Sequence, residues 1–443
     1  MTSYVPGPEP VVPTATPAEA ARSGEPRSVF VRLSAMMLLQ FIVFGSWFAT
    51  LGLVLATNGL ASIIGVAYSF AALGAIFSPM LLGAIADRFF SSQKVLAVVH
   101  AVGGILLLAL PHFVSAGEGG TVLALIFVYM LFFQPTLGLT NSIAFRHVGE
   151  NQRVFPYIRV FGTLGWIVAG LAVGWAGLSA STGVFLVASV ASFLLAAYAL
   201  TLPKTPPAGR GSRFSIGDLV GAKAWAMFRH RNFTIFAVCA LLTSICLATY
   251  NAYASPFLAA VGIENVAGVL AIGQISEVVF IVTIPFVLTR LGMKWALFAG
   301  MVMWGIRFVL FILAAQDAAW LAILGVALHG ICNDFFLILG AMYVDRVAPV
   351  QFKAQAQSMF LFISSGIGVF LGSLVAGQVY NSVVAPQIET GGAGLGAWSS
   401  LWLLPISASI VTAVLWMVFF RERAHQDLDP VDLVPTTGSR KTV

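Results

Sequence analysis

The chain has 443 residues, of which 59% are hydrophobic and only 9% are charged, and its mean hydropathy is +0.94. Soluble domains carry about 25% charged residues, so this composition excludes a soluble globular protein. The apolar stretches are long and continuous, which also excludes a membrane β-barrel. A nucleic-acid partner is not expected despite the net charge of +6, because the basic residues lie in short loops between apolar stretches.

The middle of the chain is predicted to cross the membrane twelve times, since one span needs about 20 apolar residues. The longest connection, 203–232, is expected to be a cytoplasmic linker between a six-helix bundle over 29–202 and a second one over 233–422. Residues 1–28 and 423–443 are expected to be cytoplasmic tails, the first of them disordered. The predicted spans lie near 33–56, 61–86, 95–115, 121–145, 157–178, 182–202, 233–258, 265–289, 295–316, 319–344, 355–384 and 398–420.

The basic residues set the orientation of these spans. All of the 23 Lys and Arg residues except Arg159 and Arg307 lie in the tails, the linker or the loops on one side. Loops rich in Lys and Arg face the cytoplasm, so both termini of this multi-pass, plasma (inner) membrane protein are predicted to be cytoplasmic. The loops of the opposite side carry only acidic charges, at Glu118, Glu264, Asp317 and Glu389.

The two bundles resemble each other in sequence. Corresponding residues lie about 200 positions apart, and the pairs are Arg88 and Arg290, Gly165 and Gly368, and Gly174 and Gly377. A constant offset indicates two six-helix repeats of parallel topology. Twelve spans, a basic central linker and paired halves predict the major facilitator fold, an all-α architecture with two six-helix bundles around a central cavity.

Three segments of the N-terminal bundle contain polar residues that are candidates for function. The turn after span 2, "GAIADRFF", contains Asp87 and Arg88, which we expect to form a conformational gate without touching substrate. In span 4, Asn141 is a candidate ligand, whereas threonine hydroxyls in that span can simply bond back to their own helix. In span 5, Arg159 and Thr163 share one helical face, although Arg159 could also be an interfacial side chain near the cytoplasmic end.

The C-terminal bundle places four ionisable groups near the middle of the membrane. Counting about 1.5 Å per residue along each span puts Glu277, Arg307, His329 and Asp334 at about 15–22 Å depth. Ionisable residues at that depth are costly and usually face a water-filled cavity. Gln274 lies one turn before Glu277 on the same face, which favours a cavity on that side.

These charged residues could instead have a purely structural role, and the sequence alone leaves this alternative open. Arg307 could pair with a carboxylate or hold backbone carbonyl groups, and the two acids could serve packing alone. In span 7, "TYNAYASPF" adds Tyr250 and Asn251 as further polar candidates.

Four stretches of the chain closely resemble the nucleoside:proton symporter family of the major facilitator superfamily. The similarity extends over nearly all of residues 30–422, and its closest match is a less-characterised branch of the family. The stretches are "GAIADRFFSSQK", "FPYIRVFGTLGW", "GQISEVVFIVTIPFVLTRLGMK" and "HGICNDFFLILGAMYVDRVAP".

The resemblance implies a nucleoside site in the central cavity. The family positions that bind substrate or couple protons correspond to Arg159, Thr163, Asn251, Gln274, Glu277 and Asp334. Characterised carriers of the family have Gln where this chain has Ala248, and Tyr and Phe where it has His329 and Asn333. These differences fall in the expected site and leave the identity of the substrate open.

The resulting hypothesis is a proton-coupled symporter that imports nucleosides across the bacterial inner membrane by alternating access. Glu277 is expected to bind ribose hydroxyls and Asp334 to carry the proton, with the two roles exchangeable. Burial disfavours a charged carboxylate and a nearby cation favours it, so the two acids can differ in protonation. His329 and Asn141 are expected to contact substrate, and an aromatic residue, Phe335, Tyr250 or Trp47, to face the base.

A sugar or polyol symporter of the same fold is the main alternative, followed by a proton-driven drug exporter. An enzyme is not expected, because the six histidines are scattered and no paired cysteines or nucleophile motif accompany them. We expect no metal and no cofactor, with the proton as coupling ion. The expected partners are a small-molecule substrate and membrane lipid, and the expected state is a monomer.

Overall fold

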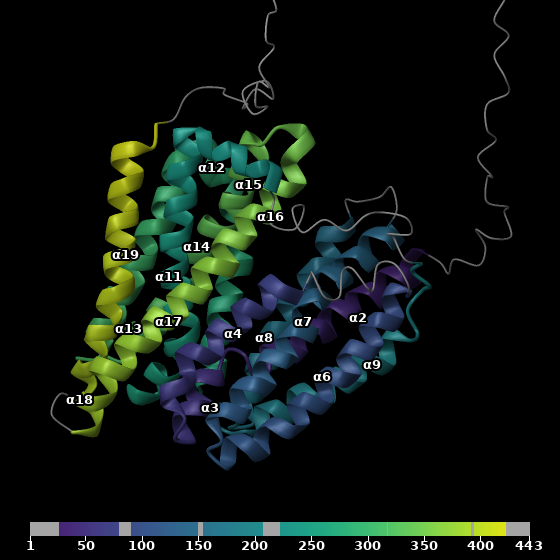
Figure 1. The fold of residues 1–443 in the computed structure, drawn as a ribbon, viewed down its shortest axis with the longest axis horizontal. Helices are drawn as coiled ribbons and strands as arrows, with labels where there is room; N and C mark the ends of the chain where they lie inside the picture. Colours follow the sequence, from purple (N-terminus) through teal and green to yellow (C-terminus); the bar gives the residue numbers. More distant parts are fainter. Residues whose placement is uncertain are drawn as a thin grey trace, which may run out of the picture.

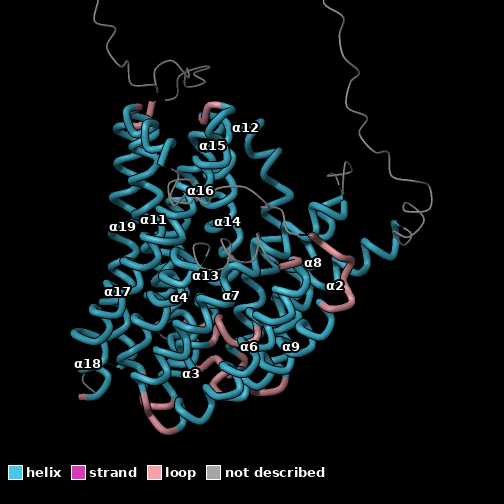
Figure 2. The backbone as a smooth tube through the Cα atoms, turned by 45° about the vertical axis from the view of Figure 1, so that its right-hand side comes forward, coloured by secondary structure: helices cyan, strands magenta, loops and turns pink. Residues whose placement is uncertain are grey.

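The computed structural model describes residues 26–78, 90–148, 154–206, 222–316, 318–390 and 394–421. Within these ranges the regular structure is entirely helical, without a strand (Figure 2). The predicted all-α class is therefore confirmed. The predicted gate residues Asp87 and Arg88 lie outside the described residues, as do residues 1–25, half of the linker (207–221) and the C-terminal tail 423–443.

The first half of the chain forms the helices drawn in purple and blue in Figure 1. Span 1, predicted as one helix over 33–56, is in fact two helices separated by a turn over 46–50, and its first helix already begins at Pro26. The helices are α2 (Pro26–Gly45), α3 (Leu51–Thr57), η1 (Ala61–Ile63), α4 (Ile64–Ser78), α6 (Ser92–Ser115), α7 (Gly119–Val148), α8 (Phe155–Trp175) and α9 (Gly183–Ala199).

The second half contains more irregular helices. Span 10 bends by 40° at Leu328, and π-helical segments interrupt spans 10 and 11. The helices are η4 (Ala222–Arg229), α11 (Arg231–Ala260), α12 (Val266–Ala314), α13 (Trp320–Ala327), α14 (His329–Asn333), η5 (Asp334–Ile338), α15 (Leu339–Val347), η6 (Val350–Phe352), α16 (Lys353–Leu361), η7 (Phe362–Gly368), α17 (Val369–Val379), η8 (Tyr380–Val384), α18 (Ala385–Glu389), η9 (Gly394–Gly396) and α19 (Ala397–Phe419).

The 49-residue helix α12 contains two membrane spans rather than one. Its backbone reverses at Gly292, where φ is 74° and ψ is 169°. Only glycine adopts such a positive φ without a steric penalty. This turn separates the predicted spans 265–289 and 295–316 and lays them side by side.

The two halves pack against each other mainly through three helix pairs, α4 with α17, α8 with α12 and α3 with α11. The first two crossings depend on glycine. A Cβ atom on Gly65 would lie 2.5 Å from the Cα of Gly377, and one on Gly174 would overlap the side chain of Asn265. Close backbone approach of this kind is typical of membrane helix interfaces.

Hydrogen bonds between the halves lie at the same end of the molecule as these two crossings. The backbone N–H of Leu53 donates to Ser255 Oγ at 3.2 Å, and that of Ala267 donates to Ser179 Oγ at 3.1 Å. The Asn381 amide donates to the Ser62 carbonyl at 2.8 Å. This end of the interface is therefore closed.

The glycines that match between the two repeats have matching environments. A Cβ on Gly165 in span 5 would strike the Leu38 backbone in span 1, and one on Gly368 in span 11 would lie 2.5 Å from the Ser244 side chain in span 7. Spans 1 and 7, like spans 5 and 11, are equivalent in the two repeats. The sequence offset therefore reflects a repeated packing contact.

We expect Gly65→Ala to lower the melting temperature of the detergent-solubilised protein by several degrees, because an added methyl at a full contact costs about 1–3 kcal/mol. The matched control is Gly138→Ala, since a Cβ at Gly138 meets no atom within 4 Å. Equal melting of the two variants would contradict the proposed role of the Gly65–Gly377 crossing.

Candidate functional site

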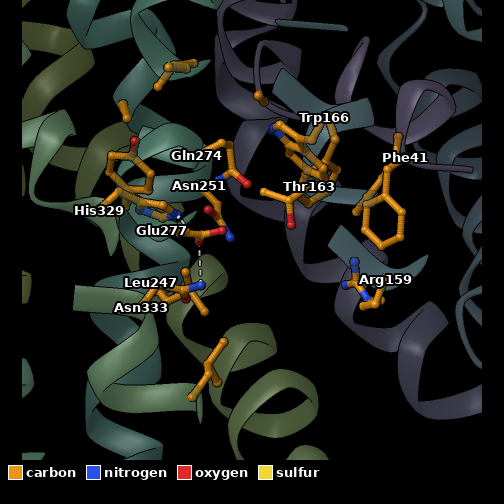
Figure 3. Close-up of a pocket in the computed structure, with 17 residues that line it drawn as sticks. Phe41, Arg159, Thr163, Trp166, Leu247, Asn251, Gln274, Glu277, His329 and Asn333 are labelled. Atoms are coloured by element: carbon orange, nitrogen blue, oxygen red, sulfur yellow. Dashed lines mark hydrogen bonds and ion pairs between the residues drawn. The ribbon is translucent and has the colours of Figure 1, made fainter. Parts of the chain in front are cut away.

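A cavity of ≈ 340 Å³ lies between the two halves. Its walls come from five spans: α2 and the turn after it, α8, α11, the first part of α12, and α14 with η5. Figure 3 shows side chains of the N-terminal half on one wall and side chains of the C-terminal half on the facing wall. The volume falls within the range of small-molecule sites, about 300–1,000 Å³.

The N-terminal wall combines aromatic rings with one cation. The rings of Phe44 and Phe48 lie 4.4 Å apart between centroids, and Trp166 stands edge-on to Phe44 at 5.1 Å. The guanidinium carbon of Arg159 lies 4.4 Å above the centroid of the Phe41 ring. Among the described residues Arg159 has no ion pair, so its charge is available to a ligand in the cavity.

The C-terminal wall is polar and centres on Glu277. Asn333 Nδ2 donates to Glu277 Oε1 at 2.7 Å, and His329 Nε2 lies 3.1 Å from the same oxygen (Figure 3). Gln274 and Asn251 lie beside this group. The Glu277 side chain is 18% exposed, so a carboxylate and several amides face the aromatic wall.

The cavity brings together seven of the residues predicted from the sequence. These are Arg159, Thr163, Tyr250, Asn251, Gln274, Glu277 and His329. Arg159 lies in the second turn of α8, near the predicted cytoplasmic end, and still reaches the cavity because its side chain extends over the Phe41 ring.

Three other predicted residues do not line the cavity. Phe335 is buried between helices, where a Cβ on Gly300 would lie 2.8 Å from it. Asn141 belongs to α7, which contributes no residue to the lining. Asp334 is only 3% exposed and its Oδ2 is buried without a hydrogen-bond partner in the described part of the chain. It follows Asn333 directly, so it lies immediately behind the polar wall.

The aromatic wall was missed in the sequence analysis, which named only Trp47 in the same span. Trp47 is fully buried inside the N-terminal bundle, as is Gln40, which bonds Thr136 at 2.7 Å. The signal was present nonetheless, since phenylalanines repeat at 41, 44 and 48 with helical spacing. An aromatic stripe in an apolar span is hard to distinguish from lipid-facing side chains.

Residues 27–425 match the family described as Nucleoside H+ symporter. The chain belongs to this family. It is 37% identical over 426 residues to the protein named "Putative nucleoside transporter YegT" of Escherichia coli (strain K12), covering 93% of this chain and 99% of that one. It is 32% identical over 414 residues to the nucleoside permease NupG of the same organism, covering 88% and 96%.

The fold agrees with this assignment. The crystal structure of the nucleoside transporter NupG superposes with a TM-score of 0.79 at 30% identity, covering 89% of this chain and 100% of that one. The predicted major facilitator fold is thus confirmed, and this member of the symporter family is a multi-pass inner-membrane transporter rather than an enzyme.

We expect Asn251→Ala to weaken nucleoside binding about tenfold, because a hydrogen bond lost in a largely apolar cavity costs about 1–2 kcal/mol. Asn141→Ala is the matched control and should change the affinity less than twofold, since its side chain is outside the lining. Isothermal titration of the purified protein with uridine measures both. A loss at Asn141 equal to that at Asn251 would contradict the boundary of the site.

Proposed function

We propose that this protein imports nucleosides together with protons, with both termini in the cytoplasm and the monomer as the working unit. The observation that supports this best is the asymmetry of the cavity. One wall carries aromatic rings and Arg159, and the other carries Glu277 with three amide side chains. A nucleoside has the same two parts, a flat aromatic base and a ribose rich in hydroxyl groups.

The ribose is expected to bind the C-terminal wall. Glu277 Oε1 already accepts from Asn333 and His329, which leaves Oε2 to accept hydrogen bonds from vicinal hydroxyls. Hydrogen bonds to a charged acceptor are stronger than neutral ones. Gln274 and Asn251 supply both donors and acceptors for the remaining ribose atoms.

The base is expected to lie against the N-terminal wall. Phe44, Phe48 and Trp166 provide a surface for stacking, and Arg159 with Thr163 can bond carbonyl or ring nitrogen atoms of the base. Aromatic pairs contribute about 0.5–1.5 kcal/mol beyond the burial of their area. A ligand that spans both walls couples the two halves directly.

Asp334 is the proposed proton carrier. An uncompensated carboxylate in a dry environment is costly, so proton binding removes a charge that has no hydrogen-bond donor at Oδ2. Loading substrate and proton together then allows the halves to rock about the extracellular contacts. No cofactor other than the transported proton enters this mechanism.

Uptake of uridine or adenosine into proteoliposomes should require an inward proton gradient, and a protonophore should abolish accumulation. Glu277→Gln should reduce uptake by more than tenfold, because the amide cannot accept ribose hydroxyls as a charged group does. Glu118→Gln, an exposed extracellular position bonded to Thr121, is the control and should transport normally. Accumulation that is insensitive to the protonophore would rule out symport.

Competition separates a nucleoside carrier from a sugar carrier. Excess free ribose or hexose should leave labelled uridine uptake unchanged, since neither carries an aromatic base to fill the N-terminal wall, whereas unlabelled nucleosides should inhibit it. Inhibition by free sugars at equal concentration would favour a sugar or polyol symporter instead.

A further inference from the structure

Arg307 is a fully buried cation at the level of the cavity, yet it does not line it. Its Nη1 lies 3.0 Å from Nδ1 of His329, while Nε and Nη2 have no partner among the described residues. The guanidinium carbon lies 3.4 Å from the centroid of the Tyr250 ring and 5.3 Å from that of Trp304. A buried charge of this kind needs a compensating charge nearby.

The contact with Arg307 fixes the proton on His329. A guanidinium group has donors and no acceptor, so His329 Nδ1 must accept the hydrogen bond. The neutral imidazole then carries its proton on Nε2, which lies 3.1 Å from Glu277 Oε1 and donates to it. Tyr250 stacks on the imidazole with 5.0 Å between ring centroids and 27° between planes, which holds the ring in this orientation.

One imidazole, that of His329, therefore connects the Arg307 cation to the Glu277 carboxylate, and the two opposite charges compensate each other. A neutral His329 stands between the cation of Arg307 and the carboxylate of Glu277, and Asn333 donates to the same carboxylate oxygen. Donors directed at a carboxylate favour its charged form. A second proton on His329 would place another positive charge beside Arg307. The negative charge that compensates Arg307 must therefore come from Glu277 and not from the imidazole.

We propose that Arg307 is a positioning residue for substrate binding, which acts through His329 to hold the Glu277 carboxylate in the orientation that binds substrate. The inference rests on the proposed nucleoside site. The titratable or charged groups facing this Arg307–His329–Glu277 relay from the neighbouring helices are Tyr250, Cys332, Asp334 and, across the cavity, Arg159.

Uridine binding to the purified full-length protein tests the inference. Arg307→Gln should weaken binding about tenfold, because His329 then loses the contact that orients it toward Glu277. Arg307→Lys keeps the charge and should restore most of the affinity. An equal loss in both variants would overturn the proposal.

A second measurement needs no substrate and therefore stands apart from the proposed function. Melting temperatures of the ligand-free Arg307→Gln, Glu277→Gln and doubly substituted proteins form a double-mutant cycle. Each single substitution leaves one buried charge uncompensated, so the double variant should melt no lower than either single variant. If the decreases in melting temperature of the two single variants add up in the double variant, Arg307 and Glu277 are not coupled. That result would contradict the proposal even if uridine binds as proposed.

If Arg307→Gln fails to fold, the paired substitution Arg307→Met with His329→Leu replaces both relay side chains by apolar ones, while Glu277 keeps its hydrogen bond from Asn333. This variant should show at least the loss of uridine affinity expected for Arg307→Gln. Wild-type affinity in the paired variant would overturn the proposal.

Discussion

The structure depends on how one carboxylate is maintained in the middle of an apolar bundle. Glu277 is surrounded by lipid-spanning helices, where an isolated charge costs several kcal/mol. The C-terminal half meets this cost with Asn333, with His329 and, one step further, with Arg307. The reversal of α12 at Gly292 is what makes this possible, since it brings Glu277 and Arg307 onto neighbouring antiparallel spans of one continuous element.

The glycine crossings meet a second requirement, the close contact of the two halves at the closed end of the interface. Gly65 against Gly377 and Gly174 against Asn265 let the halves meet backbone to backbone. Deeper in the membrane, large side chains such as Phe44 and Trp166 line the cavity instead. Within α8, Gly174 lies at a close contact with the other half and Trp166 lies at the cavity, so side-chain size along one helix separates contact from cavity.

The sequence predicted the fold because hydropathy and charge act over whole spans. The apolar stretches specified the helices, and Gly165, Gly174 and their counterparts at 368 and 377 indicated the repeat. Polar residues on regular helices, such as Gln274 and Glu277, were also placed correctly relative to each other. These signals survive errors of several residues in a boundary.

Side-chain direction was less predictable where helices depart from ideal geometry. Span 10 bends at Leu328 and becomes π-helical at Asp334, so a straight helical count does not tell which of Asn333, Asp334 and Phe335 faces the cavity. In span 1 the polar residue Gln40 faces the bundle interior, and only three-dimensional packing identifies its buried partners. A change of one position turns a helical side chain by about 100°.

Those partners have a mechanical consequence. Gln40 of α2 bonds both Thr136 of α7 and His100 of α6, and His100 in turn meets Ser192 of α9. Four helices are thereby tied together at mid-depth, whereas α4 and α8, which touch the other half, take no part in this network. We expect the four hydrogen-bonded helices to move as one rigid body during each transport cycle. Any sliding between helices within this half is then expected at α4 and α8, which contact the other half.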